Sequence, residues 1–548
     1  MRIVFIRGVE AAAFQHPSVY RSDPAHRRPP TFYPSISPKK DKEEICDSSH
    51  RLSQNSAIIS SSSIKSVLYG QSIVQGKDAA NVNSETWSIE QTLAALSDKT
   101  CSTEELIRTT FDRIQTLNPK LKAFISVNPD YALAKAREVD SRRSAKLPLG
   151  PLAGVPIAVK DLYDTDFAPT TYGGLHYQHH RPSASAEAVR RLEQAGAIVV
   201  GKTNLHEYAY GTTSENPHHG TVLNPWNRAK IAGGSSGGSS AAVVAGMCTA
   251  AIGTDTGGSV RIPAALTGHV GLKPTFGLIS SAGVFPLAPT LDCVGPMTKT
   301  VADAALMLDV MAGYDPKDPH SVRVPVRKYQ VSAFTGTAKV GVAKHFFFDR
   351  CHASVLQVVQ SALSQLEADP RFNLDEVSVA GIDRVPEHQS AIITSEAFVV
   401  HQKLFQEQPH LYGPDVRERL AGANSVKGYE YIAADAFRRQ FQKNLHALFA
   451  EYDVIITPTT PLTATDVGQT KAHIRAHEVF VRGHLNRYTN PWNFSGLPAI
   501  TIPCGLSAEG LPVGLQLISW KFSEQKLLTI AKAVEEVISW EAAVPDLN

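Results

Sequence analysis

Three short segments carry side chains that together could cleave an acyl bond. Lys160 ends the apolar run VPIAV, Ser235 lies in the stretch IAGGSSGGSSAAVVAG (231–246), and Ser259 follows two glycines in GTDTGGSVRIPAA. A lysine at the end of an apolar strand keeps its stem in the core, and burial lowers the pKa of its ammonium group. The neutral amine can then act as a general base toward a serine hydroxyl.

The two glycines before Ser259 suit the same chemistry. Gly257 and Gly258 allow a tight turn that points successive N–H groups at one place, which is what the oxyanion of an acyl-transfer intermediate needs. Each residue also has an ordinary alternative: Lys160 as a surface lysine with a buried stem, Ser235 as a linker serine, and Ser259 as a turn serine. The joint occurrence of the three segments favours chemistry over these alternatives.

The three segments resemble those of the amidase signature enzymes. The resemblance covers residues 85–548 and rests on the segments GPLAGVPIAVKDLYDT, TVLNPWN, IAGGSSGGSSAAVVAG, GTDTGGSVRIPAALTGHVGLKPTFG and NFSGLPAITIPCG, in that order. Lys160 and Ser235 are 75 residues apart, and Ser235 and Ser259 are 24 apart, as the family's Ser-cisSer-Lys triad requires. The resemblance implies that Ser259 is the nucleophile, that Ser235, joined to Gly234 by a cis peptide bond, relays its proton, and that Lys160 is the base.

The resemblance also implies which groups would contact the substrate. The backbone N–H groups of four consecutive residues would hold the oxyanion, namely Thr256, Gly257, Gly258 and Ser259. Ala209, between two tyrosines in HEYAYG, would line the acyl pocket, with apolar walls or simply core aromatics beside it. Asp255 and Arg261 are expected to form a structural pair that braces the glycine turn, the alternative being contact with the substrate.

The elements that must position these segments follow from apolar periodicity. Ser88 and Ser102 begin capping boxes ahead of two helices, and a third helix is expected over 129–143. Later helical stretches such as SAEAVRRLEQAG alternate with the β-branched runs VPIAV, AIVVG, KVGVA, DVIITP and PAITIPCG. This alternation predicts an α/β fold in which one large domain, residues 85–548, has a central mixed β-sheet covered by helices.

Residues 1–84 differ from the rest of the chain. They are rich in Ser, Pro and Arg and show no sustained apolar period, so we expect a poorly ordered N-terminal extension. The opening segment MRIVFIRGVEAAAFQHPSVYRS carries three arginines against one acidic residue. A cytoplasmic location is expected, with a mitochondrial presequence as the alternative.

The composition argues against several other classes of protein. A net charge of +2, from 54 basic and 52 acidic side chains, provides no basic field for nucleic acid. The six cysteines include no C-x-x-C pair, which is typical of buried reduced thiols and not of a zinc or disulfide site. The pairs His179–His180 and His218–His219 lack partners at ligand spacing, and no apolar run approaches the length of a membrane span. We therefore expect no metal, no cofactor and no direct nucleic-acid partner.

One further motif has a competing interpretation. GAIVVGKT (196–203) formally matches the phosphate-binding pattern G-x-x-x-x-G-K-[ST]. Its middle residues favour a buried strand, and Gly196 suits the C-terminal end of the preceding helix. We predict that the match is coincidental.

Three functions remain open. The leading hypothesis is a free-standing amidase that hydrolyses a small-molecule carboxamide to an acid plus ammonia or an amine. A homodimer is one oligomeric state considered for it. The second is the glutamine-hydrolysing A subunit of an aminoacyl-tRNA amidotransferase complex, which residues 160–311 resemble. Those subunits usually carry an acidic, tyrosine-containing segment where this chain has VFVRGHLNRYTNPWNFSGLP. In this segment Arg482 and Arg487 could bind a substrate carboxylate, the alternative being that they lie on a solvated face. The third is a non-catalytic binding protein on the same fold.

Overall fold

The computed structural model describes residues 84–325, 328–540, 545 and 547. All of them belong to one compact unit, Gly76–Asn548. Except for Ser84, the expected N-terminal extension and its alternative as a presequence lie outside the described residues.

The described residues form a mixed α/β structure, as the sequence predicts. The strands are β1 (Phe124–Val127), β2 (Pro156–Lys160), β3 (Ile198–Thr203), β4 (Glu215–Asn216), β5 (Gly220–Thr221), β6 (Leu223–Asn224), β7 (Asn227–Ile231), β8 (Ala250–Asp255), β9 (Val270–Lys273), β10 (Cys293–Thr298), β11 (Ala338–Ala343), β12 (Phe372–Val377), β13 (Val454–Pro458), β14 (Lys471–Ile474), β15 (His477–Phe480), β16 (Ala499–Leu506) and β17 (Pro512–Ile518). The α-helices are α1 (Ile89–Ser97), α2 (Thr103–Leu121), α3 (Pro129–Ser144), α4 (Glu187–Gln194), α5 (Gly237–Val244), α6 (Arg261–Thr267), α7 (Val301–Met311), α8 (Ala353–Glu367), α9 (Val385–Glu407), α10 (Pro414–Gly422), α11 (Gly428–Phe449), α12 (Val481–Leu485), α13 (Asn490–Ser495) and α14 (Glu524–Ile538).

The helix starts follow from local capping. Ser88 and Ser102 both accept a hydrogen bond from the third residue of the helix that follows, and the side chains of Gln91 and Glu105 return one to the cap, so both predicted capping boxes are confirmed. The third predicted helix is α3. The run AIVV lies in and just before β3, and Gly196, with φ +91°, follows α4, so GAIVVGKT is a helix end and a strand, as expected.

One large mixed sheet organises the chain. Its eleven strands run in the order β1-β3-β2-β8-β10-β9-β16-β17-β13-β11-β12. β2 pairs in parallel with β3 and β8, and β11 pairs in parallel with β12 and β13, whereas the pairs in the middle of the sheet are antiparallel. β2 and β8, which carry two of the expected site segments, are therefore neighbours.

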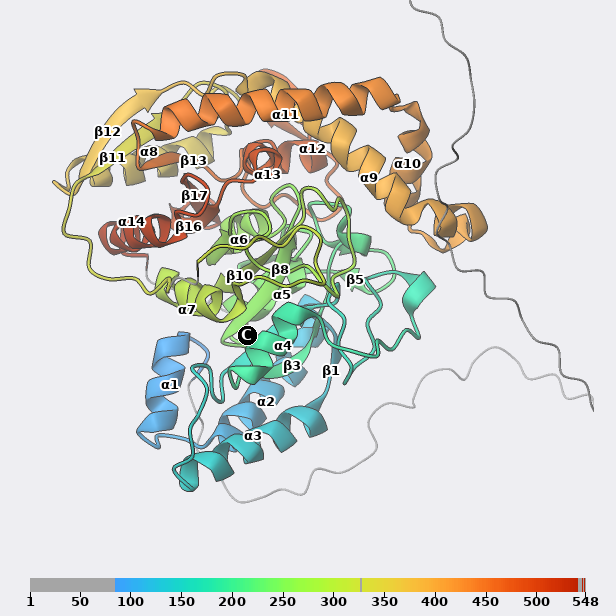
Figure 1. The fold of residues 1–548 in the computed structure, drawn as a ribbon, viewed down its shortest axis with the longest axis vertical. Coiled ribbons are helices and arrows are strands. Elements are labelled where there is room, and N and C mark those ends of the chain that lie inside the picture. The colour runs from blue at the N-terminus through green and yellow to red at the C-terminus, as the bar shows by residue number, and fades with distance from the viewer. Residues whose placement is uncertain (1–83, 326–327, 541–544, 546, 548) are drawn as a thin grey trace, which may run out of the picture. The chain divides into compact units, whose positions relative to one another are not determined.

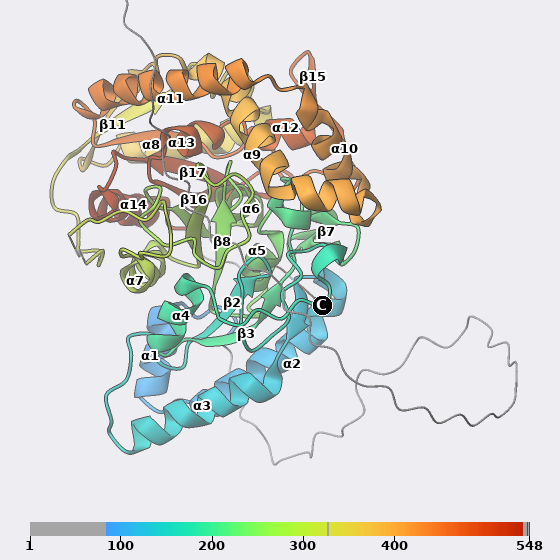
Figure 2. The same ribbon diagram turned by 45° about the vertical axis from the view of Figure 1, so that its right-hand side comes forward.

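The sheet is buried on both faces. In β2, Ile157 and Val159 pack in one core cluster while Ala158 packs in another, because successive side chains of a strand point to opposite faces. Helix α5 belongs to the Ala158 side, and α7 packs with the other cluster. Figure 1 shows α9 and α11 side by side among the C-terminal elements, and Figure 2 shows α2 and α3 together beside β3.

Two further expectations can be compared with the described part of the chain. Its five cysteines, Cys101, Cys248, Cys293, Cys351 and Cys504, are buried and have free thiols. Cys46 lies outside it. Within the described residues, no helix combines the length and the apolar character that crossing a membrane requires.

Candidate active site

Lys160 ends β2, as predicted, and its side chain is fully buried. Its Nζ donates hydrogen bonds to Ser235 Oγ and to Thr254 Oγ1, both at 2.8 Å. Burial lowers the pKa of Lys160 to about 7, against the opposing effect of Asp292 and Asp255. A substantial fraction of this amine is therefore neutral near pH 7 and able to accept a proton.

Ser235 is held by its backbone beside this lysine. The Gly234–Ser235 peptide bond is cis, as the resemblance implies. The Ser235 carbonyl accepts hydrogen bonds from the His206 N–H at 3.1 Å and from Ser214 Oγ at 3.2 Å. Residues 231–243 are all buried, and from Gly237 they form α5, which is the opposite of the exposure that a linker requires.

The turn before Ser259 requires glycine at position 258 and leaves little room for a side chain at position 257. Gly258 has a φ of +127°. A Cβ at Gly258 would lie 2.1 Å from Thr489 Oγ1, and a Cβ at Gly257 would lie 2.6 Å from Asn490 Oδ1. The turn is therefore packed tightly against the N-terminal end of α13.

The N–H groups of this turn are not equivalent. The Gly258 N–H donates to Asp255 Oδ1 at 2.8 Å, so it is already engaged within the protein. Among the described residues, the N–H groups of Thr256, Gly257 and Ser259 have no acceptor. Three of the four N–H groups expected at the oxyanion thus remain free for a ligand.

The three candidate residues are brought together to different degrees. Lys160 and Ser235 are in direct contact, whereas no hydrogen bond joins the hydroxyls of Ser235 and Ser259 in the described part of the chain. Their segments do touch, since the Ser236 N–H donates to the Ser259 carbonyl at 3.2 Å. Ser259 keeps 6% exposure whereas Ser235 and Lys160 keep none, so Ser259 is the least buried of the three.

Asp255 and Arg261 form the predicted structural pair. Arg261 Nη2 lies 2.8 Å from Asp255 Oδ1 and Nε lies 3.0 Å from Oδ2, with both side chains fully buried. Arg261 also donates to Gln516 Oε1 and to Asn493 Oδ1, each at 2.6 Å. The pair ties the glycine turn to β17 and α13, which confirms the bracing role.

Several polar residues around the turn were missed by the sequence reasoning: Thr254, Asp292, Gln389, Thr489 and Asn490. Thr254 is the second partner of Lys160, and the Asp292 carboxylate accepts from the Thr256 hydroxyl. Thr489 Oγ1 donates to the Gly257 carbonyl at 2.6 Å. Only Thr254 and Asp292 had a signal, as polar residues at the ends of apolar runs. The others lie in α9 or at the start of α13, far away in the sequence, and the sequence does not reveal how these helices pack.

Ala209 lies in a short turn that packs against the Ser235 segment. Its φ is +59°, and its N–H donates to the carbonyl of His206, the same residue whose N–H binds the Ser235 carbonyl. Tyr208 is fully buried in the main core, and its hydroxyl lies 2.8 Å from His176 Nδ1. Tyr208 is thus a core aromatic, one of the two alternatives.

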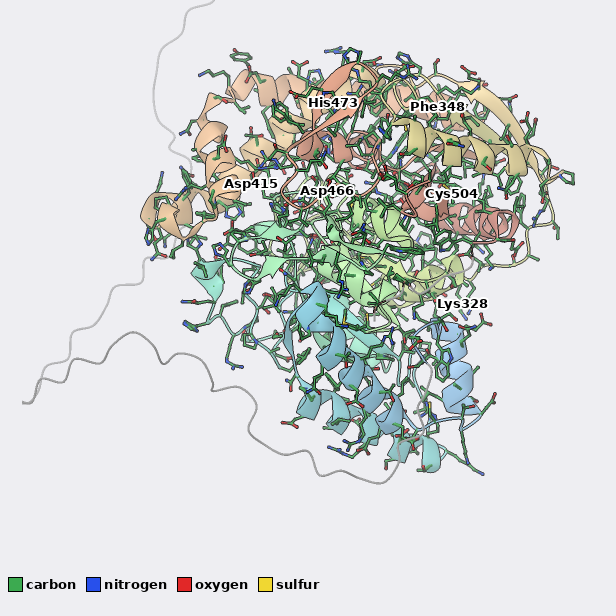
Figure 3. All side chains as sticks on the ribbon, turned by 180° about the vertical axis from the view of Figure 1, so that it is seen from behind. Lys328, Phe348, Asp415, Asp466, His473 and Cys504 are labelled. Atoms are coloured by element: carbon green, nitrogen blue, oxygen red, sulfur yellow. The ribbon has the colours of Figure 1, made fainter. Side chains whose placement is uncertain are left out.

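The two candidate arginines are both engaged with protein groups. Arg482 forms an ion pair with Asp415, a residue of α10 that is labelled in Figure 3. The Arg487 guanidinium lies 3.8 Å from the centre of the Phe346 ring. Neither is simply a solvated surface arginine.

Comparisons with known proteins agree with this geometry. The family model described as Amidase matches residues 105–528. The chain belongs to the amidase family. This assignment covers every residue of the candidate site.

Three proteins illustrate what this chain is similar to. The A subunit of glutamyl-tRNA(Gln) amidotransferase from Pseudomonas syringae pv. syringae (strain B728a) is 38% identical over 477 residues, which cover 82% of this chain and 97% of that protein. A solved structure from work on a vestigial protein complex and the origins of an s-triazine catabolic enzyme has a TM-score of 0.79 at 30% identity, covering 82% of this chain and 98% of that one. A solved amidase has a TM-score of 0.76 at 30% identity, covering 82% and 99%.

Proposed function

We propose that this amidase hydrolyses a carbon–nitrogen amide bond through an acyl-enzyme on Ser259. The observation that carries the proposal is the buried Lys160 amine, whose hydrogen-bond partners among the described residues are two hydroxyls, one of them that of Ser235 beside the Ser259 turn. A lone serine hydroxyl is a poor nucleophile, and an adjacent base is what activates it.

The proposed reaction uses the two serines in series. Neutral Lys160 accepts the Ser235 proton while Ser235 takes the proton of Ser259, whose oxygen bonds to the amide carbon. The free N–H groups of Thr256, Gly257 and Ser259 hold the oxyanion. The proton returns through Ser235 to the leaving nitrogen as the carbon–nitrogen bond breaks. Water, deprotonated by the same pair of residues, then releases the acid and restores Ser259.

The substrate is a separate question, and the relatives favour the glutamine-hydrolysing A-subunit hypothesis over a free-standing amidase. A glutamine substrate presents an ammonium and a carboxylate, so its pocket needs both signs of charge. Asp415, Arg419 and Arg482 supply both signs near the Ala209 turn, with the Arg419 guanidinium 4.9 Å from the Tyr210 ring centre. This cluster supports the second hypothesis without excluding a neutral amide for the first.

One assay separates the first two hypotheses. Acetamide, benzamide, indole-acetamide, an anilide and glutamine would be tested for release of ammonia or amine, with the chain alone and with any subunits that co-purify. Glutamine hydrolysis that depends on those subunits supports the A-subunit hypothesis. Hydrolysis of other amides by the chain alone supports the free-standing amidase.

The nucleophile is tested directly with a fluorophosphonate. We expect wild type to be labelled and Ser259→Ala to be unlabelled while remaining folded. Equal labelling of the two would contradict the role of Ser259, and an unlabelled, folded wild type would favour the non-catalytic alternative. The homodimer and the cytoplasmic or mitochondrial location stay predictions.

A further inference from the structure

Asp292 is a carboxylate beside the site that the proposed mechanism does not use. It directly precedes β10, and its Oδ1 accepts a hydrogen bond from Thr256 Oγ1 at 2.5 Å. Its Oδ2 accepts from the Leu287 N–H at 2.9 Å and from the Ala288 N–H at 3.1 Å. The side chain therefore joins the loop before β10 to the first residue of the glycine turn.

The strand register explains why Asp292 is in this place. β10 runs antiparallel to β8, with Cys293 opposite Asp255 and Val294 opposite Thr254. Asp292 therefore lies opposite Thr256. Thr254, two residues before Thr256 on β8, accepts a hydrogen bond from Lys160. A cavity of about 40 Å³ is lined by Thr254, Thr256, Asp292 and other side chains, so these groups share one space.

Asp292 has no counter-charge of its own. In the described part of the chain no cationic side chain forms an ion pair with it, and burial raises its pKa to about 6. The charge of Glu396 also raises the pKa of Asp292. The charges of Asp292 and Asp255 raise the pKa of Lys160, against the effect of burial. Asp255 is neutralised by Arg261, which leaves Asp292 as the uncompensated carboxylate near the lysine.

We propose that Asp292 is a positioning residue for the amide hydrolysis proposed above, on which this inference rests. Its carboxylate fixes the Thr256 side chain and so aims the free N–H groups at the head of the glycine turn. Its negative charge also favours the protonated form of Lys160, which is the form present once Ser259 has attacked. An asparagine would keep the shape and lose the charge.

The test is the rate of fluorophosphonate labelling of Ser259 between pH 6.5 and 9, a range that includes the pKa of Lys160, about 7, and lies above the pKa of Asp292, about 6. Asp292→Asn should be labelled about tenfold more slowly at high pH, with the acid limb of its profile moved to lower pH because Lys160 loses a stabilising charge. Thr256→Val should also be slower, but with the acid limb in its wild-type place, and Thr256→Ser should keep most of the rate. Asp303→Asn is the matched control, since burial likewise raises the pKa of Asp303 to about 6 but its Oδ1 accepts from the Ile89 N–H, away from the site.

Each outcome decides one proposal. If folded Asp292→Asn has the wild-type rate and acid limb, the positioning role is wrong while the proposed function stands. If Asp292→Asn does not fold, equal labelling of Thr256→Val and Thr256→Ser overturns the role, and faster labelling of Thr256→Ser supports it. If wild type itself is not labelled, the proposed function fails, and this inference fails with it.

Discussion

Two buried lysines on neighbouring strands differ in whether a carboxylate lies beside them. Lys160 on β2 and Lys202 on β3 are both almost entirely removed from water. Among the described residues, the partners of Lys160 Nζ are two hydroxyl groups. Lys202 Nζ also donates to two threonine hydroxyls, but in addition it lies 3.0 Å from Asp161 Oδ1 and donates to the Tyr163 carbonyl at 2.7 Å. Burial lowers the pKa of both lysines. At Lys202 the paired Asp161 carboxylate opposes this effect, because it favours the protonated amine. Burial alone therefore does not make a base.

The strand geometry decides which lysine receives the carboxylate. Asp161 follows Lys160 in the sequence, and successive side chains of an extended chain point to opposite faces. Val159 and Asp161 therefore share the face opposite to Lys160. The parallel register places Lys202 beside Val159, so Lys202 lies on the Asp161 face. Asp161, although next to Lys160 in the sequence, thus pairs with Lys202. In the described part of the chain Lys160 has no ion pair.

The largest effect expected from this contrast is on the reaction rate. Lys160→Met should lower fluorophosphonate labelling and amide hydrolysis by about 10³-fold or more near pH 7, because the serine pair loses its base. Some rate should return at alkaline pH, where hydroxide replaces the base. Lys202→Met is the matched control and should keep the rate of each folded molecule within about threefold of wild type. A similar loss in both variants would contradict the distinction.

The stability effects should have the reverse order. Lys202→Met leaves Asp161 buried without its cation, which should cost about 3 kcal/mol of unfolding free energy in urea denaturation. Lys160→Met leaves only hydroxyl groups behind and should cost less. The double variant Asp161→Asn/Lys202→Met should recover part of the loss, because the uncompensated charge is then absent. Additive losses would show that the two residues do not act as a pair.

Local features of the molecule could be predicted from the sequence, and features that depend on register could not. The run VPIAV predicted the strand that ends at Lys160, and the Ser88 and Ser102 patterns predicted the two capping boxes, because these depend on neighbouring residues alone. The pairing of Asp161 with Lys202 depends on how two strands align. No local signal carries that information.

The candidate site shows the same division. The sequence picked out the glycine turn and the Asp255–Arg261 brace, both confined to seven consecutive residues. It did not predict that Asp255 also engages the Gly258 N–H, since turn composition does not specify where each N–H points. The contact of Asp292 with Thr256 spans 36 residues and follows from the pairing of β8 with β10.

The smallest expected effect is the pH dependence of stability, and it tests the protonation state of Lys160 without any substrate. The pKa of Lys160 is about 7 in the folded chain, and an unfolded lysine has a pKa near 10.4. Between these values the unfolded state binds a proton that the folded state does not, so raising the pH stabilises the folded state. Relative to Lys160→Met, the unfolding free energy of wild type should rise by about 1.4 kcal/mol per pH unit from pH 7.5 to 9.5. The measurement is the unfolding free energy from urea denaturation at several pH values. If it changes with pH equally in the two proteins, Lys160 stays protonated when folded, and the base role would then require another group.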